Sequence, residues 1–156
     1  MKIKLGKTEQ IHFVGIGGIG MSGLALIMKE LGFRVQGSDI SLNKNIERLK
    51  KNRIKVFIGH KSSNLNKTTI LVKSSAIKNN NSEILYGKRK KIPIYSRGDM
   101  LGHVVSLMKN IVVAGSHGKT TTTSLISNIF SSAKIDPTVI NGGVRSEEHT
   151  SELQSP

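Results

Sequence analysis

Short apolar runs alternate with more polar, helix-like segments along most of the chain. The apolar runs predict strands at residues 11–15, 33–39, 54–59, 68–76, 92–96 and 110–115. Helices are predicted between them at residues 21–31, 43–51, 82–91 and 98–109, and after the last strand up to about residue 133. Alternation of this kind is typical of a parallel, doubly wound sheet, so we predict an α/β fold.

The last predicted strand opens a second strand–loop–helix pattern with almost no spacer before it. We therefore predict a first domain over residues 1–108 and the beginning of a second domain over residues 109–144. Residues 145–156 differ from both, because the apolar pattern stops and one Arg stands among three Glu in an otherwise basic chain. We expect this segment to be a tail foreign to both domains.

A first glycine-rich loop lies between the strand at 11–15 and the helix that follows it. Gly15, Gly17 and Gly20 form the pattern G-x-G-x-x-G, with Gly18 inside it. Such a loop lets the backbone approach a diphosphate, which the N-terminus of the helix then binds. Asp39 comes nineteen residues after Gly20, at the end of the next strand, where a carboxylate can bind a ribose. The pattern fits NAD and a nucleotide-sugar equally; alternatively, the glycines only allow close helix–strand packing.

A second glycine-rich loop has the sequence G-S-H-G-K-T, from Gly115 through Ser116, His117, Gly118 and Lys119 to Thr120. Its end matches the phosphate-binding pattern G-x-x-x-x-G-K-[ST], whereas the position of that pattern's first glycine is Val113. The loop amides can surround an anion, Lys119 can reach the β- and γ-phosphates, and the Thr120 hydroxyl can bind Mg²⁺. Thr121 adds a hydroxyl in the first helical turn. His117 on its own is more typical of a structural or solvent-facing residue than of a catalytic one.

The chain is strongly basic, with 24 Lys+Arg, 10 Asp+Glu and a formal charge of +14. A basic chain can bind nucleic acid, but the lysines are scattered and the aromatic residues amount to four Phe and two Tyr. We therefore expect no nucleic-acid role, and interpret the lysines as a solvated surface that attracts anionic substrates. With no cysteine, no apolar run near 18 residues and no signal-peptide pattern, we expect a cytoplasmic protein without membrane insertion.

The two loops, in this order, resemble those of the Mur ligases of peptidoglycan synthesis. The resemblance rests on GIGGIGMSGLA (15–25), GSD (37–39), SSAI (74–77), RGDML (97–101) and GSHGKTTTT (115–123). Within the family, this set is most similar to the ligases that join L-alanine to UDP-N-acetylmuramate. One departure is Ser116, where the family usually has Thr; the hydroxyl is kept. The ligases that recycle murein tripeptide are similar at the second loop and depart at the first, so they rank second.

The resemblance implies a Rossmann-like first domain that binds the UDP part of the substrate. The residues that it places around UDP are Gly15, Gly17, Gly18, Gly20, Asp39, Ser74, Ser75 and Arg97. It implies that ATP and Mg²⁺ bind at residues 115–121, with Lys119 as the catalytic residue and Thr120 as the metal ligand. The lactyl carboxylate of UDP-N-acetylmuramate would attack the γ-phosphate of ATP, and L-alanine would then attack the acyl phosphate. The segment FIGH (57–60) also resembles the family, but it gives His60 no role.

The family continues well beyond this point, with the rest of a central ATPase sheet and a further domain. We therefore expect the chain to be a fragment that is inactive alone and aggregation-prone beyond about residue 108. Residues 145–156 closely resemble a translated sequencing-library adaptor, and a natural polar tail is the alternative. Two other classes remain as rivals, an NAD-dependent oxidoreductase module and a basic P-loop protein acting on nucleic acid.

Overall fold

The computed structural model describes residue 6 and residues 8–139. The chain divides between Lys109 and Asn110 into two compact units, which are described separately below. The segment expected to be a foreign tail, residues 145–156, lies outside the described residues.

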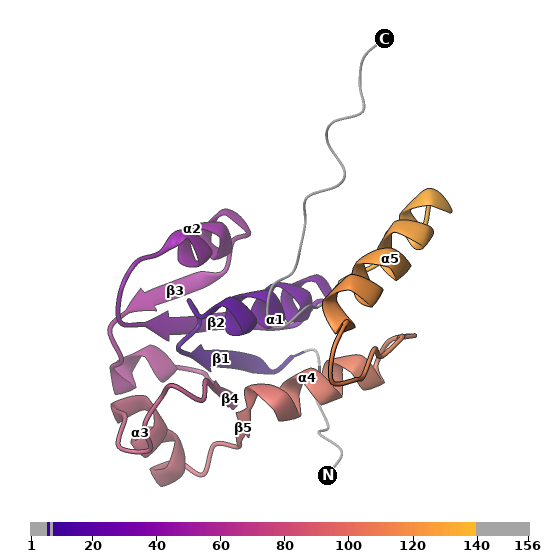
Figure 1. Ribbon diagram of the computed structural model, residues 1–156. Helices are drawn as coiled ribbons and strands as arrows, with labels where there is room; N and C mark the ends of the chain where they lie inside the picture. The colour runs from indigo at the N-terminus through magenta and orange to yellow at the C-terminus, as the bar shows by residue number, and fades with distance from the viewer. Residues whose placement is uncertain (1–5, 7, 140–156) are drawn as a thin grey trace. The chain divides into compact units, whose positions relative to one another are not determined.

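The first unit contains a parallel five-stranded sheet in the order β3-β2-β1-β4-β5 (Figure 1). The strands are β1 (Gln10–Val14), β2 (Arg34–Asp39), β3 (Lys55–Ile58), β4 (Ile70–Lys73) and β5 (Ile94–Ser96). This arrangement confirms the predicted parallel α/β fold. Its chain order reverses at β1, because β2 and β3 extend the sheet on one side of β1 and β4 and β5 extend it on the other.

Helices cover both faces of the sheet. They are α1 (Ile19–Glu30), α2 (Lys44–Lys51), α3 (Ser82–Arg89) and α4 (Arg97–Ser106), with a 3₁₀ turn η1 (Ser62–Leu65). Alternate side chains of a strand point to opposite faces, so Ile11 and Phe13 of β1 face one layer while His12 and Val14 face the other. The helices α1, α2 and α4 contribute to the first layer, and α3 with η1 forms the second.

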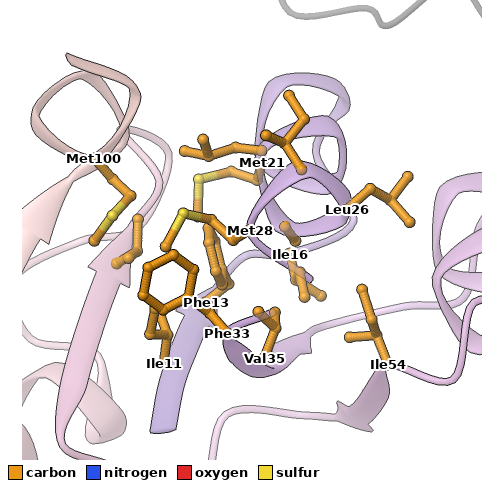
Figure 2. Packing of buried hydrophobic residues seen from close by; sticks show 14 of the residues in the cluster. Ile11, Phe13, Ile16, Met21, Leu26, Met28, Phe33, Val35, Ile54 and Met100 are labelled. Atoms are coloured by element: carbon orange, nitrogen blue, oxygen red, sulfur yellow. The ribbon is translucent and has the colours of Figure 1, made fainter. Parts of the chain in front are cut away.

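The larger core lies between the sheet and α1 (Figure 2). Phe13, Met28 and Met100 are fully buried there, and Met100 brings in α4. The smaller core, under α3, is built from Val14, Leu65, Leu71 and Ile84. Polar side chains, among them His12 and Glu83, are also buried on this side of the sheet.

Local side-chain bonds fix where three of the helices begin. Asn43 accepts a hydrogen bond from the Ile46 amide at the start of α2 (3.0 Å), and Asn81 accepts one from the Glu83 amide at the start of α3 (2.9 Å). A capping box joins Ser96 and Asp99 at the start of α4. The hydrogen bonds from the Ser96 hydroxyl and amide hold the pKa of Asp99 below its ordinary value.

In the second unit, one helix, α5 (Lys119–Ser132), follows the second glycine-rich loop. The strand predicted at 110–115 is wrong, because those residues have no regular structure and Ile111 and Val112 are exposed. A strand exists only where its backbone is paired with another strand, and no strand of the described part of this unit pairs with residues 110–115. Apolar composition alone therefore predicted a strand that local structure does not supply.

Gly37 of β2 offers a test of the packing between the sheet and the first loop. A Cβ at Gly37 would lie 2.6 Å from the Phe13 carbonyl oxygen and 2.6 Å from Ile16 Cδ1, whereas a Cβ at Gly23 of α1 would meet nothing within 4 Å. We expect Gly37→Ala to lower the free energy of unfolding in urea by about 1–3 kcal/mol. Gly23→Ala should leave it unchanged or raise it by about 0.5–1 kcal/mol. Equal effects of the two substitutions would show that this packing is misassigned.

Candidate functional site

The first glycine-rich loop lies at the carboxyl edge of the sheet, where the chain order reverses between β1 and β4. The loop leaves β1 after Val14, and the Ser74 amide, just after β4, donates to the Val14 carbonyl (3.1 Å). In open α/β sheets, such a reversal creates a crevice in which ligands bind. The structure thus places the predicted diphosphate loop at the position where this fold offers a binding site.

The carboxyl end of β2 anchors the start of the loop. The amides of Gly15 and Ile16 both donate to the Ser38 carbonyl oxygen, at 2.9 and 3.0 Å. Gly15 has a φ of +82°, and a Cβ there would come within 3.1 Å of Ser74 Cβ, so only glycine fits without strain. Gly18 ends the turn as the N-cap residue of α1.

Asp39 lies against the loop. Its Oδ2 accepts a hydrogen bond from the Gly17 amide (2.7 Å), and its Oδ1 accepts one from the Ile40 amide (2.8 Å). An ionised carboxylate has further acceptor positions, so ribose binding by Asp39 stays a prediction. The structure gives the residue a role that the sequence pattern did not suggest: it fixes the amide of the central loop glycine.

Two asparagines hold the same glycine from its carbonyl side, and sequence reasoning missed both. Asn45 Nδ2 donates to the Gly17 carbonyl at 2.8 Å, and Asn43 Nδ2 donates to it at 3.3 Å. A Cβ at Gly17 would lie 2.7 Å from Asn43 Nδ2 and 2.9 Å from Asp39 Oδ2. The available signal was the position of Asn43 before a helical segment, which predicts a cap but no contact with the loop.

Arg97, the first residue of α4, reaches the other side of the loop. A side chain at Gly20, in the first turn of α1, would occupy the place of the Arg97 guanidinium. An exposed guanidinium beside a helix N-terminus is a favourable place for an anion. Ser74 also borders the loop, because its amide donates to the Val14 carbonyl and its Cβ lies where a side chain at Gly15 would point, whereas Ser75 is exposed in the turn that follows β4.

A buried polar cluster lies beneath the loop, on the α3 side of the sheet. Glu83 of α3 is fully buried, and its Oε2 accepts a hydrogen bond from the Ser38 hydroxyl at 2.5 Å. His12 Nε2 and His60 Nδ1 lie 3.4 and 3.3 Å from the same oxygen, and Asn64 Nδ2 donates to Oε1 at 2.7 Å. The sequence pattern indicated no role for His12 or Glu83, because each stands alone in an ordinary strand or helix pattern.

Opposing effects act on the pKa of Glu83. Burial raises the pKa, while the hydrogen bond and the electrostatic attraction of His12, with hydrogen bonds from Ser38 and Asn64, lower it. The net pKa lies below the ordinary value of 4.5, so Glu83 is ionised in the folded protein at neutral pH.

The second loop is shaped by a glycine and by the lysine that follows it. Gly118 is the N-cap residue of α5 and has a φ of +76°, a backbone conformation that favours glycine. Lys119 Nζ donates to the carbonyl oxygens of Gly115 (2.7 Å) and Ser116 (3.1 Å), so its ammonium lies over the loop. The first amides of a helix have no partner within it, and together with this ammonium they can bind a phosphate.

Ser116, His117, Thr120 and Thr121 are all exposed around this loop. Thr120 is the second residue of α5, in its first turn, and its hydroxyl is an oxygen donor of the kind that Mg²⁺ prefers. Among the described residues, no group of three or more His, Cys, Asp or Glu could hold a metal ion. Metal binding by the Thr120 hydroxyl therefore stays a prediction.

Comparison with known proteins points to one family. A model described as "Mur ligase family, catalytic domain" matches residues 10–109. The chain is 69% identical over 144 residues to UDP-N-acetylmuramate–L-alanine ligase from Pelagibacter ubique (strain HTCC1062), an alignment that covers 92% of this chain and 31% of the relative. The chain therefore spans about a third of the length of this curated relative.

Solved structures agree with the fold. UDP-N-acetylmuramate–alanine ligase from Thermotoga maritima is 35% identical with a TM-score of 0.79, over 90% of this chain and 33% of that one. UDP-N-acetylmuramate:L-alanyl-gamma-D-glutamyl-meso-diaminopimelate ligase from Neisseria meningitides is 32% identical with a TM-score of 0.77, over 88% of this chain and 44% of that one.

Within residues 6 and 8–139, no helix is both long and apolar enough to cross a membrane.

The depressed pKa of Glu83 predicts how stability depends on pH. Because the carboxylate is favoured in the folded state, its contribution is fully present above the unfolded value of 4.5 and is lost as the pH falls through the lower folded-state pKa. Glu83→Gln should cost about 1–3 kcal/mol in the free energy of unfolding at neutral pH. The difference in the free energy of unfolding between this variant and the wild type should become smaller as the pH falls below 4.5, the ordinary pKa of the side chain.

Urea denaturation between about pH 7 and about pH 3 measures this difference. Glu47→Gln, at an exposed position in the first turn of α2, is the matched control and should show little effect. A cost of Glu83→Gln that stays constant over the whole range would contradict the ionised carboxylate.

Proposed function

Because the chain belongs to the Mur ligase family, we propose that the protein joins L-alanine to the lactyl carboxylate of UDP-N-acetylmuramate, with ATP as the energy source. The observation that carries this proposal is the 69% identity to a relative named for that reaction. The activity is proposed for the whole protein, since the chain spans about a third of that relative's length. A reaction on a nucleotide-linked cell-wall precursor, driven by ATP, fits the cytoplasm.

The first loop is proposed to bind the UDP part of the substrate. The diphosphate would lie at the N-terminus of α1, against the backbone of Gly17 and Gly18 and near the Arg97 guanidinium. Asp39 would accept a hydrogen bond from the ribose while it holds the Gly17 amide. Ser74, whose amide bonds to Val14 just before the loop, would border the same site, and Ser75 is assigned to it by the family resemblance alone.

The second loop is proposed to bind ATP through residues 115–121. Lys119 already lies over the loop through its bonds to Gly115 and Ser116, so its ammonium would exchange these carbonyls for phosphate oxygens. The positive charge of Lys119 would then stabilise the charge that develops on the transferred phosphoryl group. Mg²⁺ held by the Thr120 hydroxyl would supply further neutralisation of the phosphates.

The proposed chemistry proceeds in two steps. The lactyl carboxylate displaces ADP from the γ-phosphorus to give an acyl phosphate, and the amine of L-alanine then displaces inorganic phosphate to form the amide. The residues of this chain would contribute position and charge rather than a covalent intermediate. One alternative is ligation of the tripeptide named in the Neisseria structure, which would use the same UDP substrate and the same ATP loop. An NAD-binding oxidoreductase module leaves the second loop unexplained.

Titration calorimetry of the 156-residue chain with UDP-N-acetylmuramate and with NADH tests the first site. We expect binding of the UDP compound and none of NADH. Gly17→Ala should weaken that binding about tenfold or more, because a Cβ there would displace the Asp39 carboxylate and the Asn43 amide. Gly23→Ala, the same change on α1 where the new Cβ meets nothing within 4 Å, should bind like the wild type. Preference for NADH would refute the assignment.

A full-length chimera tests the second site. Residues 1–139 of this chain would replace the matching part of the Pelagibacter ubique relative, and phosphate release would be measured with L-alanine and UDP-N-acetylmuramate. We expect Lys119→Ala to lower kcat by about a hundredfold or more, since a preorganised charge on the phosphoryl group is lost, while binding of the UDP compound stays intact. Lys109→Ala, at another exposed lysine, is the control. Near-normal turnover of the Lys119→Ala chimera would contradict the catalytic role assigned to Lys119.

A further inference from the structure

The buried polar cluster joins elements that are far apart in the sequence. His12 comes from β1, Ser38 from β2, His60 from the segment after β3, Asn64 from η1 and Glu83 from α3. The side chains of His12 and Glu83 are fully buried, and that of His60 is 11% exposed. A carboxylate is costly to bury unless its oxygens accept several hydrogen bonds. When every polar group of such a cluster has a partner, the cluster holds its members in one arrangement. When one partner is lost, the remaining buried groups destabilise the fold.

The donors and acceptors of the cluster fit an ionised Glu83. The Ser38 hydroxyl has one proton, which it donates to Glu83, so the His60 Nδ1 proton points to the Ser38 oxygen (2.9 Å). Gln36 Nε2 lies 3.2 Å from His12 Nδ1, which leaves His12 Nε2 as the donor toward Ser38 and Glu83. Asn64 supplies a further donor to the other carboxylate oxygen. Glu83 is therefore the acceptor at which these bonds converge.

Ser38 connects this cluster to the nucleotide loop. Its hydroxyl belongs to the cluster, while its carbonyl oxygen accepts the amides of Gly15 and Ile16. The next residue, Asp39, accepts the amide of Gly17. A shift of the carboxyl end of β2 would therefore move three successive amides of the loop.

We propose that Glu83 is a positioning residue for the first glycine-rich loop. The Glu83 carboxylate accepts the Ser38 hydroxyl and thereby fixes the carboxyl end of β2. The position of β2 in turn sets where the loop amides lie relative to the diphosphate. The link to substrate rests on the function proposed above for this loop. His12, His60 and Asn64 contribute by keeping the carboxylate in place.

Amide hydrogen exchange by NMR, on the full 156-residue chain, tests the positioning directly. Glu83→Gln removes the charge, and Ser38→Ala removes the hydroxyl while keeping the carbonyl; the second variant carries the test if the first does not fold. The reference amides are Phe33 and Ile54, which donate to Met28 and Leu49 on the other face of the sheet. In both variants the amides of Gly15 and Ile16 should lose about tenfold more protection than the references. Glu47→Gln, the control, should change the protection of neither pair of amides.

Affinity for UDP-N-acetylmuramate provides the second measurement. We expect its Kd to rise about tenfold in both variants under conditions in which each is folded. Equal loss of protection at all four amides would overturn the proposal, because it would show a stabilising role only, and so would selective loss with an unchanged Kd. If the wild-type chain does not bind the compound at all, the proposed function fails, and the ratio of exchange rates alone still decides whether Glu83 positions the loop.

Discussion

The hydrogen bonds of Ser38 are the constraint on which the first site depends. One residue at the carboxyl end of β2 accepts two loop amides with its carbonyl and donates its hydroxyl to a buried carboxylate. The loop contains four glycines among its residues 15–20 and has little intrinsic rigidity, because glycine loses more conformational freedom on folding than any other residue. Its shape must therefore be imposed by neighbours. Ser38 and Asp39 impose it from β2, and Asn43 and Asn45 from the start of α2.

The second loop depends on a different and more local arrangement. Gly118 gives the left-handed turn, α5 presents its first amides, and Lys119 folds back over the carbonyls of its own loop. These features lie within a few residues of one another, so the described contacts that shape this loop are local. The two glycine-rich loops of this Mur ligase family member are thus held in shape by different means, one through long-range hydrogen bonds and one through local geometry.

The contrast explains what the sequence could predict. Local patterns gave the parallel α/β fold, the position of each strand in the first unit and the two glycine loops, since periodicity and glycine spacing are written in adjacent residues. They failed at residues 110–115, where an apolar run has no strand to pair with in the described part of its unit. They also missed the Glu83 cluster, because His12, Ser38 and Glu83 come together only through the order of the strands and the placement of α3. The pattern predicted Asp39 at the end of the second strand, where it lies, but its bond to the Gly17 amide needed the three-dimensional structure.

The central claim of the proposed function is that the two loops bind two different ligands. An NMR titration of the ¹⁵N-labelled chain tests this claim most directly. UDP-N-acetylmuramate should shift the amide resonances of Gly17 and Gly18 and leave those of Gly118 and Lys119 unchanged, whereas ATP with Mg²⁺ should do the reverse. The same resonances moving with both ligands, or no movement in the first loop with the UDP compound, would contradict the assignment of the two loops.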